Sequence, residues 1–310
     1  MVSHGDDVII VDRLSKKFGD LTAVNDVSFS VRTGEIFGIL GPNGAGKTTI
    51  MECIEGIQHP TSGNTTVLGM DTQQRSSQVK ERIGVQLQAS AYFDYLTLTE
   101  ILKLFGQFYK QSVQPSVLLE EVELADKADS TVDKLSGGQK QRFTIAATLV
   151  NDPEVVFLDE PTTGLDPQAR RNLWDFIKRI NSKGRTVVLT THYMEEAEFL
   201  CHRIAIMDQG RIVAMDTPAG LISQLPMPYE VKVVADSNGH ADSLAALAAV
   251  KEVAYDDDGT IRLRSTDASS TLPALMNWAS SSDVHLTHLE VVPANLEDVF
   301  LSLTGRGLRD

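Results

Sequence analysis

The chain has 310 residues, enough for one large domain or two modest ones, and its 42% hydrophobic and 23% charged residues are ordinary for a globular protein. A formal net charge of -14 argues against a general nucleic-acid binder and against unaided adhesion to an anionic membrane. Cys53 and Cys201 lie far apart and outside any C-x-x-C pattern, so they predict neither a disulfide framework nor a zinc site. Because no signal peptide or membrane-length apolar run is visible, we expect a cytosolic protein.

The first segment of the chain predicts strands joined by a turn that carries an aromatic residue. Residues 8–11 and 27–31 have strand character, and the second run alternates between apolar and polar residues. Between them, residues 16–20 predict a polar turn that includes Phe18, which on its own would be a core or turn residue. Residues 36–40 predict a short buried strand.

A glycine-rich loop follows that buried strand and matches the phosphate-binding pattern G-x-x-x-x-G-K-[ST]. Its residues are Gly41, Pro42, Asn43, Gly44, Ala45, Gly46, Lys47 and Thr48, and a helix is predicted from Thr49 to Ile54. The glycines let backbone N–H groups approach phosphate oxygens, and the helix N-terminus adds partial positive charge. Lys47 supplies a charge for the β- and γ-phosphates, and the Thr48 hydroxyl is a candidate Mg²⁺ ligand. A plain turn with a surface lysine is the alternative, which the strand–loop–helix context disfavours.

The next part of the chain predicts a strand at residues 83–88 that ends in glutamines. Leu98 to Tyr109 has helical spacing, with Thr97 or Thr99 as a plausible N-cap. Residues 115–134 are mixed and charged, and they predict helix and loop.

A second glycine-rich segment precedes a helix predicted to run to about Val150. Its residues are Leu135, Ser136, Gly137, Gly138 and Gln139. Ser136 and Gln139 have capping-box spacing, which alone would make an ordinary helix start. A capping box does not require two adjacent glycines, so we expect something to approach the backbone there, and an anion is the natural candidate.

Two carboxylates end the next predicted strand, at residues 155–160. Ligand sites of open α/β sheets lie at the carboxyl edge of the strands, so Asp159 and Lys47 can meet at one site if their strands are close. Asp159 is then expected to hold Mg²⁺ through water, and Glu160 to orient or activate an attacking water. A pair of solvated acids at a strand end is the alternative.

A further buried strand is predicted at residues 186–191, after a polar loop at 161–167 and a helix to about Ser182. It delivers His192 at its carboxyl end. A lone histidine is more often structural than functional, but this position favours a functional one. The residues after His192 do not follow H-E-x-x-H, which excludes a zinc-protease site.

The sequence predicts two domains, at residues 1–225 and 226–310. The first ends after a hairpin predicted across residues 208–210, and a proline-punctuated linker at 225–228 leads into the second. Strands and helices are then predicted at 229–234, 243–250, 253–255, 261–263, 272–279 and 284–292. Their β-α-β-β-α-β order predicts a small α+β ferredoxin-like module, and a capped amphipathic helix closes the chain at 295–303. No chemistry is visible in this half, so we expect it to serve packing or dimerisation.

Taken together, these motifs resemble the ATP-binding subunit of an ABC transporter over roughly the first 225 residues. Gly41–Thr48 matches the Walker A loop, and Val155–Glu160 matches Walker B with its catalytic glutamate. Leu135–Gln139 is a complete match to the ABC signature, which separates this family from other P-loop NTPases. Leu165-Asp166 matches the D-loop and His192 the switch histidine. The resemblance implies an α/β cassette with a RecA-like core built on a mixed sheet, an antiparallel β-subdomain and a helical subdomain.

The resemblance also implies residue roles for ATP and Mg²⁺. Phe18 stands where the family has an adenine-stacking aromatic, and its ring keeps the π-face of the usual tyrosine. Gln88 stands where the Q-loop glutamine reaches Mg²⁺ and senses the membrane partner, with Gln86 as a nearby competitor. Glu160 would polarise the attacking water, and His192 would contact the γ-phosphate.

The family implies partners as well. A second copy of the chain, or a paired cassette, would face it head to tail, with Ser136 and Gly138 of one closing over the γ-phosphate held by the other. The wording of residues 190–198 and of the tail at 296–309 is similar to bacterial exporters of the daunorubicin-resistance type. These keep their membrane spans on a separate permease, so the chain is expected on the cytoplasmic side of the membrane.

The expected function is therefore to power the export of a small, hydrophobic or drug-like molecule. Export of a lipid or polysaccharide is an alternative that these residues do not distinguish. A soluble ABC protein acting on the ribosome or DNA is disfavoured by the single P-loop, the lack of a heptad run and the acidic charge. A non-catalytic regulator is disfavoured because Glu160 and His192 are both present.

Overall fold

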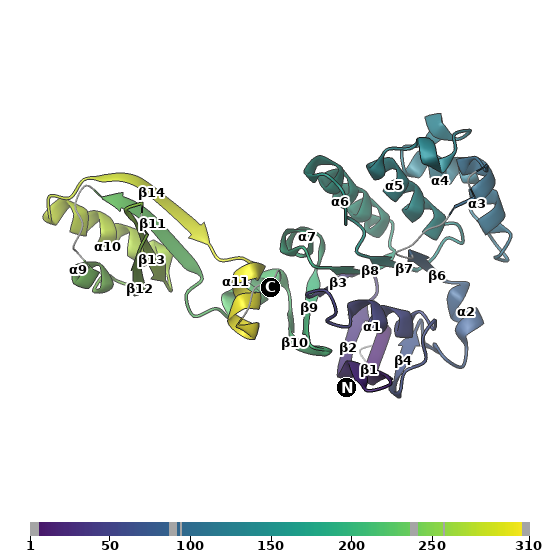
Figure 1. The fold of residues 1–310 in the computed structure, drawn as a ribbon, viewed down its shortest axis with the longest axis horizontal. Helices are drawn as coiled ribbons and strands as arrows, with labels where there is room; N and C mark the ends of the chain where they lie inside the picture. Colours follow the sequence, from purple (N-terminus) through teal and green to yellow (C-terminus); the bar gives the residue numbers. More distant parts are fainter. Residues whose placement is uncertain (1–5, 87–91, 94, 236–240, 257, 306–310) are drawn as a thin grey trace. The chain divides into compact units, whose positions relative to one another are not determined.

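The computed structural model describes residues 6–86, 92–93, 95–235, 241–256 and 258–305, and over these residues the chain forms two compact units (Figure 1). The units are Met1–Pro218 and Ala219–Leu308. The domain boundary at 225/226 stays a prediction, and in the structure the division falls earlier, next to a short helix, α8 (Pro218–Ser223).

The central sheet of the first unit has the strand order β10-β9-β3-β8-β7-β6. Its strands are β3 (Ile36–Leu40), β6 (Ile83–Gln86), β7 (Val155–Asp159), β8 (Thr186–Thr191), β9 (Arg203–Asp208) and β10 (Arg211–Asp216). From β9 to β6 all neighbours pair in parallel, and β10 returns antiparallel to β9. Every residue of β3, β7 and β8 is buried, which explains the run of apolar residues that each strand contains. Their carboxyl ends therefore share one edge.

An antiparallel sheet of order β2-β1-β4-β5 packs beside this core. Its strands are β1 (Asp7–Phe18), β2 (Leu21–Arg32), β4 (Ser62–Val67) and β5 (Met70–Asp71). The polar turn predicted at residues 16–20 is wrong in part, because Lys16, Lys17 and Phe18 continue the ladder with β2. The turn is confined to Gly19 and Asp20, and cross-strand pairing overrides the polar composition of the segment.

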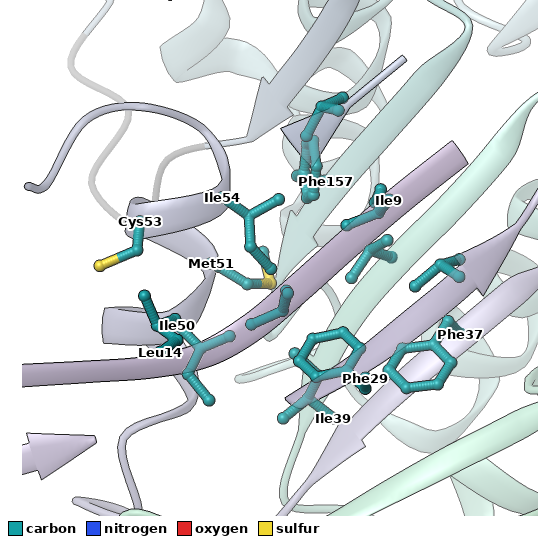
Figure 2. Packing of buried hydrophobic residues seen from close by; sticks show 14 of the residues in the cluster. Ile9, Leu14, Phe29, Phe37, Ile39, Ile50, Met51, Cys53, Ile54 and Phe157 are labelled. Atoms are coloured by element: carbon teal, nitrogen blue, oxygen red, sulfur yellow. The ribbon is translucent and has the colours of Figure 1, made fainter. Parts of the chain in front are cut away.

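The two sheets and the first helix share one hydrophobic core (Figure 2). Phe29 of β2 stacks on Phe37 of β3, with ring centroids 5.2 Å apart. From the helix α1 (Lys47–Ile54), Ile50, Met51 and Ile54 enter the same cluster. This packing holds the start of α1 beside the end of β3.

Further helices complete the first unit. They are α2 (Ser76–Lys80), α3 (Leu98–Gly106), α4 (Pro115–Glu121), the 3-10 turns η1 (Ala125–Lys127) and η2 (Val132–Lys134), α5 (Gly137–Thr148), α6 (Pro167–Ser182) and α7 (Met194–Leu200). Thr97 is the N-cap of α3, with a complete capping box. The helix predicted to reach Tyr109 ends at Gly106, because the next residues close in turns with bonds such as Tyr109 N to Gly106 O.

The second unit has one antiparallel sheet of order β12-β13-β11-β14. Its elements in chain order are β11 (Tyr229–Ala235), α9 (Ala241–Ala245), β12 (Val250–Tyr255), β13 (Thr260–Ser265), α10 (Ala268–Ser281), β14 (Leu286–Pro293) and α11 (Leu296–Thr304). The order β-α-β-β-α-β is the one expected, although α9 ends earlier and α10 begins earlier than their predicted bounds. The earlier start of α10 follows from Asp267, whose carboxylate caps the N–H groups of Ser269 and Ser270.

Candidate functional site

The phosphate-binding loop joins the carboxyl end of β3 to α1, as its sequence predicts. Neighbouring backbone leaves no room for a side chain at two of its glycines. A Cβ on Gly41 would lie 2.4 Å from Met207 O, and one on Gly46 would lie 2.3 Å from Ala23 O. Gly46 also has φ of 100°, in the left-handed region that favours glycine. These glycines are therefore required by the fold of the chain itself.

Lys47 is the first residue of α1, and its side chain folds back over the loop. Its Nζ donates to Gly41 O at 2.9 Å and to Pro42 O at 3.1 Å, and it lies 3.3 Å from Glu160 Oε1. The side chain is only 4% exposed. Burial lowers the pKa of Lys47, and attraction to Glu160 and Asp159 opposes that change. The ammonium is thus held at the carboxyl edge of the central sheet.

Thr48 and Asp159 are brought together, although they are far apart in the sequence. The Thr48 hydroxyl donates to Asp159 Oδ2 at 3.0 Å. The other carboxylate oxygen, Oδ1, accepts from the hydroxyl of Thr190, its neighbour on β8. The expectation that the acid after β7 meets the loop after β3 holds because β8 alone separates these parallel strands.

Glu160 lies at the centre of a cluster of polar side chains. Besides Lys47, its carboxylate has His192 Nδ1 at 3.2 Å from Oε2, and the Thr163 hydroxyl donates to Oε2 at 3.1 Å. Its backbone N–H donates to Thr190 Oγ1 at 3.0 Å. Glu160 has a φ of 47°, which is uncommon for a residue other than glycine. Backbone strain of this kind clusters at functional sites.

The electrostatics of this cluster favour an ionised Glu160. Burial works against the charged form, but the positive charge of Lys47 and the contact with His192 outweigh it, so the pKa of Glu160 is lowered. The group is therefore a carboxylate at neutral pH, able to accept a hydrogen bond from water.

A cleft of about 730 Å³ lies over the loop and reaches Phe18. It is lined by Phe18, Leu21, Thr22, Ala23, Asn43, Gly44, Gly46, Lys47, Thr48, Thr49, Glu160, Gln209 and Gly210. Phe18 ends β1 with 44% of its surface exposed, and Lys16 Nζ lies 4.8 Å from its ring centroid. The structure thus brings this aromatic ring into the cleft of the phosphate-binding loop.

Some lining residues were not foreseen from the sequence. Leu21 to Ala23 come from the start of β2, and Gln209 and Gly210 from the turn between β9 and β10. The Gly210 N–H donates to Ala45 O at 3.0 Å, which fixes that turn against the loop. No local sequence signal marks these residues, because their place depends on tertiary packing alone.

The second glycine-rich segment lines a different pocket, of about 500 Å³. Its lining includes Ser136, Gly137, Gly138, Gln139, Gly164, Leu165 and Asp166. It shares no lining residue with the cleft over the phosphate-binding loop. The predicted capping box is present, since Ser136 Oγ accepts from Gln139 N at 3.3 Å and Gln139 Oε1 accepts from Ser136 N at 2.9 Å.

The glycines of this second pocket are under less steric pressure from their own chain than Gly41 and Gly46, although Gly138 has a tight neighbour. A Cβ on Gly137 would have its nearest contact, Leu165 Cδ2, at 3.9 Å, and one on Gly138 would meet Ala169 Cβ at 3.3 Å. Neither glycine has positive φ. Asp166, the predicted D-loop residue, caps α6 by accepting from Ala169 N at 2.9 Å.

Three other predicted positions are the candidate Q-loop residues Gln86 and Gln88 and the signature residue Leu135. Gln88 falls outside the described residues, which in this segment stop at Gln86, the last residue of β6. Gln86 is buried, and its Oε1 has no hydrogen-bond partner among the described residues. Leu135 is buried and packs as a core residue rather than lining the signature pocket.

The fold and the two glycine-rich sites define an ATP-binding cassette, and comparison with known proteins agrees. The sequence profile of the family described as ABC transporter matches residues 24–163. Two solved structures share the cassette fold. "Structure of ATP binding subunit of ABC transporter" has a TM-score of 0.63 and 28% identity, covering 70% of this chain and 92% of that one. A dimeric cassette in a post-hydrolysis state bound to ADP and Pi has a TM-score of 0.61 and 27% identity, covering 67% and 98%.

The chain belongs to the ATP-binding subunits of ABC transporters, and it is an ATPase whose ATP hydrolysis is coupled to transport. It is similar over 303 residues, at 39% identity, to the Nod factor export ATP-binding protein I of Burkholderia lata, covering 96% of this chain and 97% of that protein. It is similar at 36% identity to the linearmycin resistance ATP-binding protein LnrL of Bacillus subtilis, covering 96% and 99%. The predicted family, fold class and ATPase activity are thus confirmed. Among the described residues, no helix has the length and apolar character needed to cross a bilayer.

Proposed function

We propose that this chain powers the export of a small molecule, working as a nucleotide-sandwich dimer beneath a separate membrane-spanning permease on the cytoplasmic side. The observation that carries the proposal is the cluster of Lys47, Glu160 and His192 next to the Thr48–Asp159 pair. It joins a phosphate-binding charge, a candidate base and oxygen ligands at one edge of the sheet.

The oxygen donors beside Lys47 fit a Mg²⁺ ion. Mg²⁺ prefers hard oxygen ligands and is held in nucleotide sites by few protein groups together with phosphate oxygens and water. Thr48 Oγ1 and the Asp159 carboxylate are such donors, 3.0 Å apart, and Gln88 is the third proposed ligand. When bound, Mg²⁺ supplies positive charge that neutralises the β- and γ-phosphates.

Catalysis would rest on Glu160 as the group that orients and polarises the attacking water. The Glu160 carboxylate is ionised, so it would accept a proton from water as the water oxygen bonds to the γ-phosphorus and the bond from that phosphorus to the bridging oxygen breaks, which releases ADP. His192, 3.2 Å from Oε2, holds the carboxylate in place and contacts the γ-phosphate. Lys47 exchanges its contact with Glu160 for the phosphate oxygens.

A second cassette is needed to complete the site. The cleft and the signature pocket have no lining residue in common, so the signature of one chain would cover ATP held by another. The free backbone at Gly137 and Gly138 and the start of α5 suit a γ-phosphate. A second copy of this chain, or a paired cassette, would supply them.

The cargo is assigned to the permease rather than to this chain. The two relatives are named for Nod factor export and for linearmycin resistance, which are different tasks, yet both resemble this chain over nearly all its length. These names support a small exported molecule, and the resistance protein supports a drug-like one. ATP binding and hydrolysis by this chain would drive the permease in the same way for either cargo.

The variant Glu160→Gln tests the catalytic assignment, with Glu154→Gln, an exposed glutamate at the other end of β7, as the matched control. We expect Glu160→Gln to bind ATP with near wild-type affinity, to lose turnover by about 100-fold or more, and to accumulate a dimer with ATP and Mg²⁺. Equilibrium binding, phosphate release and size-exclusion chromatography measure the three effects. Wild-type turnover in Glu160→Gln would refute the assignment.

Purification of the tagged chain from detergent-solubilised cells tests the partner. We expect a multi-span membrane protein to copurify, and its reconstitution with this chain should restore ATP-dependent export of a small hydrophobic probe. Recovery with ribosomes or DNA alone would contradict the proposal, and export of a lipid or polysaccharide instead would correct the cargo class.

A further inference from the structure

A fully buried carboxyl group lies behind the catalytic cluster. Glu196 of α7 is 0% exposed, and its Oε1 accepts a hydrogen bond from Trp174 Nε1 of α6 at 3.0 Å. Glutamate is rarely buried completely unless it is paired, so its presence here calls for a physical reason. None of the proposed catalytic steps uses this group.

The surroundings of Glu196 connect it to both segments that carry catalytic residues. The hydroxyls of Thr162 and Thr191 lie close to its carboxyl group. Thr162 follows Glu160 by two positions, and Thr191 directly precedes His192. Neither Glu196 Oε2 nor Thr162 Oγ1 has a well-aligned hydrogen-bond partner among the described residues, so the two groups are in close contact without a formed hydrogen bond.

A second contact joins the same helices. Arg170 and Trp174 are one turn apart on one face of α6. The Arg170 guanidinium lies 4.0 Å from the ring centroid of Tyr193, whose ring centroid is 4.1 Å from that of His192. Trp174 also contacts Phe199 of α7, with ring centroids 5.1 Å apart. Helix α6 thus supports the segment after His192 at several points.

We propose that Glu196 is a positioning residue that holds the strand end bearing His192 and the loop after Glu160 in register against α6. The proposal rests on the roles assigned above to Glu160 and His192. Their 3.2 Å separation depends on two short segments, residues 160–163 and 191–193, that belong to no helix. Glu196 is the group that both segments and α6 share.

The chemistry of the contact needs a hydrogen-bonding group more than a charge. Burial raises the pKa of Glu196, and the polar contacts with Thr191, Thr162 and Trp174 and the charge of Arg170 oppose the rise only in part. The carboxyl group accepts from Trp174 through Oε1 and lies near the hydroxyls of Thr162 and Thr191. A glutamine of the same length keeps an acceptor for Trp174 and adds a donor for a threonine hydroxyl.

The test compares Glu196→Ala and Glu196→Gln in the full-length chain, with exposed Glu195→Ala on the same helix as the control. Misplacing a catalytic pair by about 1 Å lowers turnover by up to about 100-fold, so we expect Glu196→Ala to lose at least about 10-fold in kcat. The KM for ATP should change by less than about two-fold, because the phosphate-binding loop is untouched. Glu196→Gln should stay within about three-fold of wild type, and Glu195→Ala should match wild type.

Several outcomes would overturn the proposal. They are an unchanged kcat in Glu196→Ala, a parallel loss of kcat and ATP affinity, and a Glu196→Gln variant as impaired as the alanine. If Glu196→Ala does not fold, Trp174→Phe removes the indole donor while keeping a ring, and a kcat equal to wild type in a folded Trp174→Phe would contradict the proposal. The Glu160→Gln variant tells a failure of the proposed function from a failure of this inference. Wild-type turnover in Glu160→Gln would refute the catalytic role of Glu160, whereas the Glu196 variants test the positioning role alone.

Discussion

The phosphate-binding loop and the signature segment are both glycine-rich starts of a helix, yet their glycines exist for different reasons. At Gly41 and Gly46, a Cβ would collide with backbone atoms of the same chain at 2.4 and 2.3 Å. At Gly137 and Gly138, the nearest contacts of a Cβ are 3.9 and 3.3 Å away. The first pair is demanded by the fold. At Gly137 the fold leaves room for a side chain, and at Gly138 the fit against Ala169 is tight but involves only another side chain. Under the proposed function, a bound phosphate or a partner chain would require these glycines.

The two regions also differ in their charged groups. The phosphate-binding loop has Lys47, Asp159 and Glu160 beside it. The signature pocket combines the capped start of α5 with charged side chains that include Glu123, Arg142 and Arg179. In the function proposed above, the first region would bind and hydrolyse ATP and the second would cover ATP held by a partner. Each region would then be half of a shared site.

The largest effect is expected from Lys47→Ala, which removes the ammonium group of the phosphate-binding loop. Because the ammonium is buried among the loop carbonyls and is the direct charge for the phosphates, ATP affinity should fall by about 100-fold or more. Exposed Lys80→Ala is the control. Fluorescent-nucleotide titration measures both, and unchanged affinity in Lys47→Ala would rule out the loop as the ATP site.

A negative charge placed at Ser136 tests whether a phosphate approaches the signature pocket. Asp and Asn both cap helices as well as Ser, so Ser136→Asp and Ser136→Asn should fold alike. Only the aspartate repels an approaching phosphate, and its turnover should be lower than that of the asparagine variant by about 10-fold or more. ATP binding by the isolated chain should be unaffected. Equal steady-state ATPase rates in the two variants would show that no anion approaches this helix.

A smaller effect is expected at the far end of the cleft. Phe18→Ala removes the exposed ring, and a lost aromatic stack of about 1 kcal/mol should weaken ATP binding by about five-fold. Phe18→Tyr keeps the π-face and should bind like wild type. If the alanine variant binds ATP as tightly as wild type, adenine does not stack on Phe18.

The last prediction concerns the stability of the chain, not its activity, and how that stability depends on pH. Glu55, the C-cap of α1, is 3% exposed, and burial together with repulsion from Asp159 and Glu52 raises its pKa from 4.5 to about 8. The folded state therefore binds this proton more tightly than the unfolded state. Its contribution to the free energy of unfolding is fully present below pH 4.5 and is lost between 4.5 and 8, by up to about 1.4 kcal/mol per pH unit.

Glu55→Gln removes that titration. We expect its Tm to exceed the wild-type value by about 10 degrees at pH 8, with the gap closing towards pH 5. Thermal melts of both proteins across this range measure the gap. A difference that does not change with pH would contradict the raised pKa.

The parts of the site that could be predicted are those encoded by short contiguous sequence motifs. The phosphate-binding loop, the strand ending in Asp159 and Glu160, and the Ser136–Gln139 capping box each combine a local pattern with a chemical requirement, so spacing alone identifies them. The buried strands β3, β7 and β8 were equally clear, because strands covered on both faces carry short runs of consecutive apolar and β-branched residues.

The parts that could not be predicted depend on chain segments that meet only after folding. The turn at Gln209 and Gly210 enters the cleft through a hydrogen bond to Ala45. Lys16 to Phe18 extend β1 because β2 pairs with them, against their polar composition. Glu196 gives no sign in sequence of being buried, because Trp174, its donor, comes from another helix.

The left-handed backbone of Glu160 has a further consequence for how this position can change. A residue with a Cβ held at φ of 47° is disfavoured by about 1 kcal/mol, and glycine or asparagine would relieve much of that strain. Neither can reach His192 and a water molecule as glutamate does. At this position the local conformational preference and the activity favour different amino acids, so selection for thermostability alone would drive the chain towards an inert ATP-binding protein.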